Sequence, residues 1–180
     1  MKHLIAQLEA ALEPLFVRID RLGGGRLASY RMREDLRDHP RTHRAFAGIA
    51  AILCLEIVVG LTAVVIAIVL TVTADGVAWA VWFRSVAVLG ITATLLYFAW
   101  RASRGWYWAY SRLRLFSRIF PIVTLVIATI PGLYPLWMTI EQILFSLLMI
   151  GIGDILTTDH MRDAFPRPPR RGEGGALTTG

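Results

Sequence analysis

The chain is short of the residues that cross-link or solubilise a folded domain. It has one cysteine, Cys54, which excludes an intrachain disulfide and a metal site built from several cysteines. It has one lysine, Lys2, so arginine supplies nearly all of the positive charge, which we read as a mark of a high-GC bacterial source. Only 18% of the 180 residues are charged and 56% are hydrophobic. A soluble domain of this size rarely has that balance, so the composition predicts a membrane protein.

Motifs for nucleophilic catalysis, phosphate binding and zinc hydrolysis are missing as well. The three glycines at 23–25 are consecutive and follow a helical pattern, so they do not resemble a phosphate-binding loop. His39 and His43 have the i, i+4 spacing of a metal pair, but the sequence fixes no third ligand near them. We expect no metal site and no cofactor, and a non-enzymatic protein is favoured over an enzyme.

Four apolar stretches are long enough to be considered as membrane-spanning helices. Together they predict an all-α integral membrane protein, a four-helix bundle. The first stretch begins too late, and is too long, for a signal peptide. The four predicted spans cover residues 45–73 and about 77–100, 115–130 and 136–157, with short turns at 74–76 and 131–135.

Cytosolic segments are expected on both sides of the four-span domain. The sequence predicts three parts: an amphipathic and charged helical segment over residues 1–44, the four spans over residues 45–158, and a cytosolic tail over residues 159–180 that is mostly disordered. Within 1–22 the apolar residues share one helical stripe, able to pack on lipid, on a partner helix or on this protein's own cytosolic face. The stripe consists of Leu4, Ile5, Leu8, Leu12, Leu15, Phe16, Ile19 and Leu22.

The distribution of arginine predicts the orientation. The amino-terminal segment, residues 101–118 and the tail are basic, whereas the turns at 74–76 and 131–135 contain no Lys or Arg. Four spans with both termini in the cytoplasm of a bacterial inner membrane satisfy the positive-inside rule at every loop.

Four charged residues lie within or near the predicted spans and are candidates for function, since charge is costly in hydrocarbon. Arg84 and Glu141 fall toward the outer side, where they could form an ion pair. Asp154 falls near the inner side, within reach of Arg112, Arg114 or Arg118. Glu56 lies near mid-membrane without an obvious partner, on one helical face with Gly60, Ala63 and Ala67. Its carboxyl group is expected either to hydrogen-bond a backbone carbonyl or Thr92, Thr94 or Thr124, or to carry a proton or cation.

The stretch 101–118 alternates arginine with aromatic residues and contains no acid. A helix lying at the inner headgroup layer and contacting anionic lipids explains this pattern better than nucleic-acid binding does. The residues expected to contact headgroups are Arg101, Arg104, Trp106, Trp108, Arg112, Arg114 and Arg118.

Three classes of function remain open from the sequence. The favoured one is an accessory or interaction subunit of a membrane assembly, which binds another membrane protein or further copies of itself. The second is an oligomeric transporter or channel coupled to protons or cations through Glu56, an architecture also found in small multidrug-resistance transporters. The third is a membrane-embedded enzyme that acts on a lipid through Asp154, Asp159, His160 and Asp163.

Overall fold

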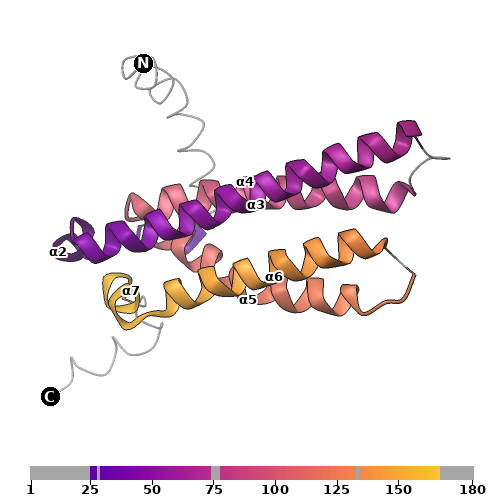
Figure 1. The fold of residues 1–180 in the computed structure, drawn as a ribbon. Helices are drawn as coiled ribbons and strands as arrows, with labels where there is room; N and C mark the ends of the chain where they lie inside the picture. The colour runs from indigo at the N-terminus through magenta and orange to yellow at the C-terminus, as the bar shows by residue number, and fades with distance from the viewer. Residues whose placement is uncertain (1–24, 28, 74–77, 133, 167–180) are drawn as a thin grey trace, which may run out of the picture.

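The computed structural model describes residues 25–27, 29–73, 78–132 and 134–166, and this part of the chain is a helical bundle (Figure 1). The long helices are α3 (Pro40–Thr73), α4 (Trp79–Ser103), α5 (Tyr107–Ala128) and α6 (Leu136–Thr157), and the short ones are η1 (Gly25–Leu27), α2 (Glu34–Arg37) and α7 (Asp159–Ala164). Three of them, α3, α4 and α6, are long and apolar enough to cross a membrane, which indicates a membrane-embedded protein. Helix α5 has the length but carries Arg112, Arg114 and Arg118 in its first half.

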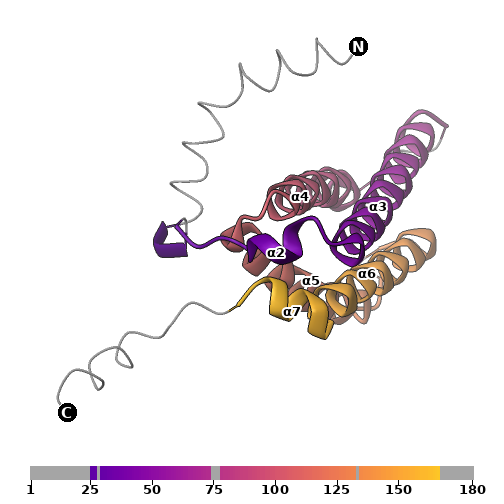
Figure 2. The same ribbon diagram turned by 90° about the vertical axis from the view of Figure 1, so that its left-hand side faces the viewer.

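The four long helices run alternately up and down the bundle. Helix α3 packs against α4 and α6, and α5 also packs against α4 and α6. Figure 1 shows the α3/α4 pair lying beside the α5/α6 pair, and Figure 2 views the four helices from the end where α2 and α7 lie. We call this end, where α3 begins and α6 finishes, the basic end, and the opposite one the turn end.

Several predicted boundaries agree with the structure. Helix α3 ends at Thr73, where the first predicted span ends, although it begins at Pro40, before the predicted start at residue 45. Helix α6 covers the predicted residues 136–157. The predicted stripe within 1–22 and the turn at 74–76 lie outside the described residues.

The segment 101–118 does not form a separate helix as predicted, and its contact with lipid headgroups stays a prediction. Helix α4 continues to Ser103, and α5 begins only four residues later, at Tyr107, as one helix that reaches Ala128. The chain reverses at Gly105, whose φ of +89° is a conformation that a glycine adopts without strain. Arg112, Arg114 and Arg118 therefore lie on a long helix of the bundle.

The folded part also extends beyond the predicted start of the tail. Helix α7 turns back onto the basic end, where Met161 and Ala164 are fully buried. The ring of Phe165 stacks on that of Tyr110 with the centroids 4.2 Å apart. This packing places residues 159–166 in the fold, while residues 167–180 lie outside the described part.

Small residues on α3 allow the helices to approach closely. A Cβ atom at Gly60 would lie 2.9 Å from Cδ2 of Leu89 on α4, closer than carbon atoms pack. Ala63 and Ala67, one and two turns farther along α3, are buried as well. The small-residue face predicted from the sequence is therefore occupied by contacts within this chain, as is typical of packed membrane helices.

Candidate functional site

Glu56 lies in the interior of the bundle, about halfway along α3. The residue is 3% exposed, and neither carboxylate oxygen has a hydrogen-bond partner in the described part of the chain. Thr92 and Thr124 donate to backbone carbonyls of their own helices, and Thr94 is exposed and does the same. The hydrogen bond that we expected from Glu56 to one of these threonines is not formed.

One polar residue from each long helix lies at nearly the same level of the bundle. Gly60 of α3 contacts Leu89 of α4, so these two residues lie at the same level of the bundle. Counted from this contact toward the basic end at a rise of about 1.5 Å per residue, Glu56 and Thr92 lie at levels that differ by no more than about 2 Å. Counting in the same way from the contact of Gly48 with Ile155 puts Ser146 at that level within about 2 Å. The hydroxyl oxygens of Ser146 and Thr124 are 2.7 Å apart. We call Glu56, Thr92, Thr124 and Ser146 the polar layer.

Gln142 continues the polar layer toward the turn end. It lies one turn before Ser146 on α6 and is 1% exposed. Its Nε2 donates to the backbone carbonyl oxygen of Thr124, and its backbone carbonyl oxygen accepts a hydrogen bond from the Ser146 hydroxyl. Its side-chain oxygen Oε1 is buried without a partner among the described residues. Buried polar atoms are nearly always hydrogen-bonded, so these unpartnered oxygens on two neighbouring levels are exceptions in the packing of the bundle.

An ion pair lies between the polar layer and the turn end. Nη1 of Arg84 donates to Oε2 of Glu141 at 2.7 Å, and the two side chains are only 9% and 11% exposed. The Arg84 guanidinium also lies 5.3 Å from the centre of the Tyr134 ring. The pair joins α4 to α6, and the predicted pairing of Arg84 with Glu141 is confirmed. It lies ~13 Å along the axis from Glu56, too far to compensate that carboxyl group directly.

Apolar side chains close the bundle on both sides of these groups. Toward the basic end they form a thick core that includes Leu53, Leu95, Met149 and Ile152, all almost fully buried. Toward the turn end a thinner cluster consists of Ala67, Val81 and Met138. The polar layer is therefore enclosed, with the shorter apolar barrier on the side of the ion pair.

Other predicted site residues are placed differently. Asp154 is exposed on α6 and forms no ion pair with Arg112, Arg114, Arg118 or any other described residue, so its expected pairing is wrong. Trp108 is 1% exposed and packs edge-on against Phe98, which removes it from contact with a headgroup layer. Arg101 is 5% exposed. Trp106 and Arg114 are partly exposed, whereas Arg104, Arg112 and Arg118 are exposed at the basic half of the bundle.

The acids and histidines near α7 do not converge on one site. His160 is turned toward α3, with Nε2 2.9 Å from the Thr42 hydroxyl and its ring 4.9 Å from that of His39. Asp159 lies 3.6 Å from Arg162, and Asp163 borders a groove that Arg33 and Arg114 also line. Within the described residues no three His, Cys, Asp or Glu side chains are placed to hold a metal ion.

Sequence reasoning missed Gln142 and Ser146. They are the polar residues i and i+4 on α6, which places them on one face of a helix that is otherwise apolar at that depth. That spacing was the available signal, and it is weaker than a formal charge because serine and glutamine occur in many membrane helices.

Comparisons with known proteins gave no match to a family model, to a curated protein or to a solved structure.

The buried ion pair provides a test of the packing. Arg84→Gln or Glu141→Gln alone leaves one charge buried without its partner, so we expect each to cost about 3–5 kcal/mol of unfolding free energy. The double variant should lose clearly less than the sum of the two, as measured by thermal unfolding in detergent. Arg33 and Asp35 form the matched control, an exposed pair at 2.7 Å, where the same cycle should show no coupling. Additive effects at Arg84 and Glu141 would contradict the pairing.

Proposed function

We propose that this chain is a four-span protein of a bacterial inner membrane that takes up and releases a proton, or exchanges it for a cation, at Glu56. It would then act as a transporter or channel built from several copies of the chain. The observation that carries the proposal is the enclosed carboxyl group of Glu56, whose two oxygens lack a hydrogen-bond partner among the described residues. Burying a carboxyl group without a hydrogen-bond partner costs free energy, and acidic residues buried in membrane helices usually serve ion or proton pathways.

The surface of α5 supports its assignment as the fourth span. Its second half presents aliphatic side chains to the outside of the bundle, among them Ile119, Ile122 and Val126, with exposed fractions of 48–65%. Such a surface is stable in lipid and unfavourable in water. The arginines of the first half lie toward the basic end, from which long side chains can reach the headgroups.

The charge asymmetry supports a cytoplasmic basic end. The arginines of the segment 101–118 lie on that half of the bundle, while the turns at 74–76 and 131–135 contain no Lys or Arg. The positive-inside rule then puts both termini in the cytoplasm, with anionic headgroups of that leaflet as the lipid partners.

The reading as an accessory subunit remains a second prediction with less support. It drew on the small-residue face of α3, which is buried within this chain. Its other basis, the apolar stripe within 1–22, lies outside the described residues.

Thiol labelling of the full chain tests the four-span topology. In a Cys54→Ala background, a membrane-impermeant maleimide should label Pro131→Cys in intact cells but label Ser103→Cys only after permeabilisation. Both positions are exposed: Ser103 is the last residue of α4, just before α5 begins, and Pro131 follows shortly after α5 ends. Labelling of both from the same side would show that α5 does not cross the membrane.

Proton flux tests the role of Glu56. Proteoliposomes that contain a pH-sensitive dye should equilibrate an imposed pH gradient faster than empty liposomes. Glu56→Gln should lower the protein-dependent rate at least tenfold, because an amide of the same shape cannot exchange a proton, while Glu56→Asp should retain part of it.

Asp154→Asn is the matched control for that assay, since it makes the same change of a carboxyl group to an amide at an exposed position. Its rate should equal that of the wild type. Equal rates for the wild type and Glu56→Gln, or no rate above that of empty liposomes, would refute the proposal.

A further inference from the structure

Arg118 of α5 and Asp154 of α6 lie at nearly the same level of the bundle. A Cβ atom at Gly153 would lie 3.4 Å from the hydroxyl oxygen of Ser117, so these two residues mark one level. Arg118 and Asp154 directly follow them, and because the two helices run in opposite directions their levels differ by about 3 Å. Both residues are exposed, and neither side chain forms an ion pair with the other or with a further described residue.

The two charges lie on the outer face of the α5/α6 pair. In two antiparallel helices, the residues that directly follow two facing residues turn toward the same side of the helix pair. Phe116 lies about 200° around α5 from Arg118, and its ring stacks on that of Phe98 of α4 with the centroids 6.0 Å apart. Arg118 and Asp154 are therefore on the face that points away from α3 and α4 (Figure 2).

The rest of this outer face is apolar and contains an open glycine. Gly151, three residues before Asp154, has no atom of the described residues within 4 Å of the place where a Cβ atom would lie. Gly60 and Gly153, in contrast, are each in contact with a neighbouring helix of this chain. An open glycine on a membrane helix allows a further helix to approach closely. The α6 side chains in line with Asp154 are 42–60% exposed: Ile140, Ile143, Leu147 and Ile150.

Lipid alone is an unfavourable environment for Asp154. Helix α6 has 22 residues and a length of about 33 Å, close to the ~30 Å of a hydrocarbon core. Asp154 lies about 4.5 Å from the end of this helix and therefore near the edge of that core. An aspartate side chain is too short to reach the headgroups as arginine does, and anionic headgroups repel it. A protein surface that brings an arginine to this level would compensate its charge.

A second copy of the chain brings such a surface. Rotation about an axis along the membrane normal keeps every residue at its own depth. A copy turned by 180° about that axis, with its outer face against this one, places its α6 on α5 and its α5 on α6. Arg118 then faces Asp154 of the partner subunit, and by symmetry a second identical ion pair forms. Two opposite charges at one level of one face are what this symmetry requires.

We propose that the outer face of the α5/α6 pair is the interface of a two-fold symmetric dimer of this chain. Ion pairs between Arg118 and Asp154 of the partner subunit join the two copies, and Gly151 lets the helices approach. The proposal rests on the membrane-spanning arrangement and on the assembly of several copies in the proposed function, and it gives that assembly an interface. It does not depend on proton binding at Glu56.

Charge reversal tests the ion pairs between copies. Arg118→Asp gives every copy two acids at this level, and Asp154→Arg gives every copy two arginines. Each variant alone should therefore require an about tenfold higher protein-to-lipid ratio to dimerise. Energy transfer between donor-labelled and acceptor-labelled full chains in liposomes measures this ratio. A mixture of the two variants should dimerise like the wild type, because their opposite charges meet only between copies.

The mixture distinguishes the proposal from its alternatives. An ion pair within one chain, or contact of both residues with lipid headgroups, predicts that the mixture dimerises no better than its components, and that result would overturn the proposal. Asp154→Asn should retain the dimer, since an amide oxygen still accepts a hydrogen bond from arginine. Arg33→Asp and Asp35→Arg reverse the charges of the exposed pair at 2.7 Å and should change nothing, alone or mixed.

The open glycine has a matched control on α4. Gly151→Leu should raise the protein-to-lipid ratio needed for dimerisation about fivefold or more. Gly90 is also without an atom of the described residues within 4 Å, so Gly90→Leu changes the lipid-facing surface in the same way, and it should have no effect. Equal effects of the two leucine variants would contradict the interface.

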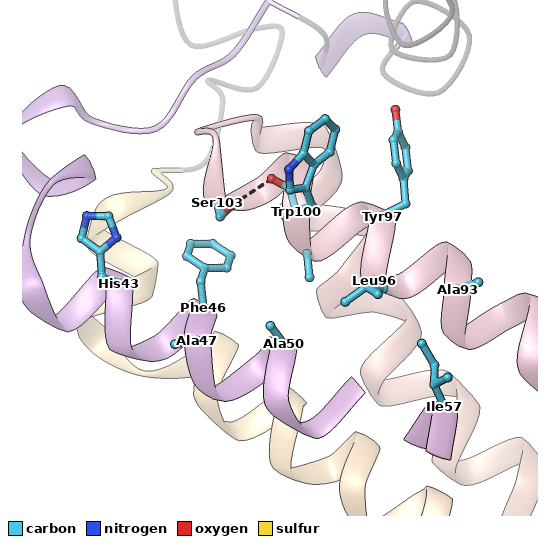
Figure 3. A pocket seen from close by; sticks show the side chains of 11 residues that line it. His43, Phe46, Ala47, Ala50, Ile57, Ala93, Leu96, Tyr97, Trp100 and Ser103 are labelled. Carbon is cyan, nitrogen blue, oxygen red and sulfur yellow. Dashed lines mark hydrogen bonds between the residues drawn. The ribbon is translucent and has the colours of Figure 1, made fainter. Parts of the chain in front are cut away.

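Disulfide formation tests the contact in bacterial membranes. In a Cys54→Ala background, a chain with Arg118→Cys and a differently tagged chain with Asp154→Cys should form a linked dimer on oxidation. Ala47→Cys and Ser103→Cys are the matched control, because these exposed residues share one level on α3 and α4, counted from the Gly60–Leu89 contact (Figure 3). The control pair should not link.

A control pair that links as well as the test pair, or a test pair that does not link, would overturn the proposal. The dimer and the proton role fail separately. Glu56→Gln should dimerise like the wild type, so a dimer without proton flux refutes only the role of Glu56. Flux that depends on Glu56 without a dimer at this face refutes only the interface.

Discussion

Burial of the Glu56 carboxyl group is the constraint on which the rest of the structure depends. A carboxylate or an unpartnered carboxylic acid is expensive in a medium that offers no water, and the cost rises as neighbouring side chains exclude solvent. Hydroxyl and amide side chains of the other helices lie within about one helical turn of its level, and none of them donates a hydrogen bond to it. Among the described residues, no hydrogen bond therefore fixes the orientation of the Glu56 carboxyl group.

The helix contacts that position Glu56 also limit access to it. Gly60 brings α3 against Leu89, and this contact sets the level of Glu56 relative to Thr92. Farther along, the Arg84–Glu141 pair ties α4 to α6, two helices that are otherwise diagonal in the bundle. The apolar cluster beyond this pair is thinner than the core on the other side of Glu56, so the shorter apolar barrier lies toward the turn end.

The sequence predicted the helices better than it predicted their faces. The bounds of α6, the end of α3 at Thr73 and the pairing of Arg84 with Glu141 followed from apolar runs and from depth. The exposure of Trp108 and Arg101 did not follow, because the turn at Gly105 sends the chain directly back along α4 and rotates α5 so that its first residues face the core. Periodicity gives little help for such helices, since a span that faces lipid is apolar on the outside as well as on the inside. Asp154 lacks its expected partner for a related reason: similar depth does not place two residues on facing sides of their helices.

Infrared difference spectroscopy of the full chain in liposomes measures the central claim most directly, because it reports the protonation of a carboxyl group whether or not transport occurs. The account predicts a band from a protonated carboxylic acid that disappears as the pH is raised, shifts in D₂O and is missing from Glu56→Gln. A Glu56 band that stays constant across the pH range and does not shift in D₂O would contradict it, and would make Glu56 a fixed part of the packing.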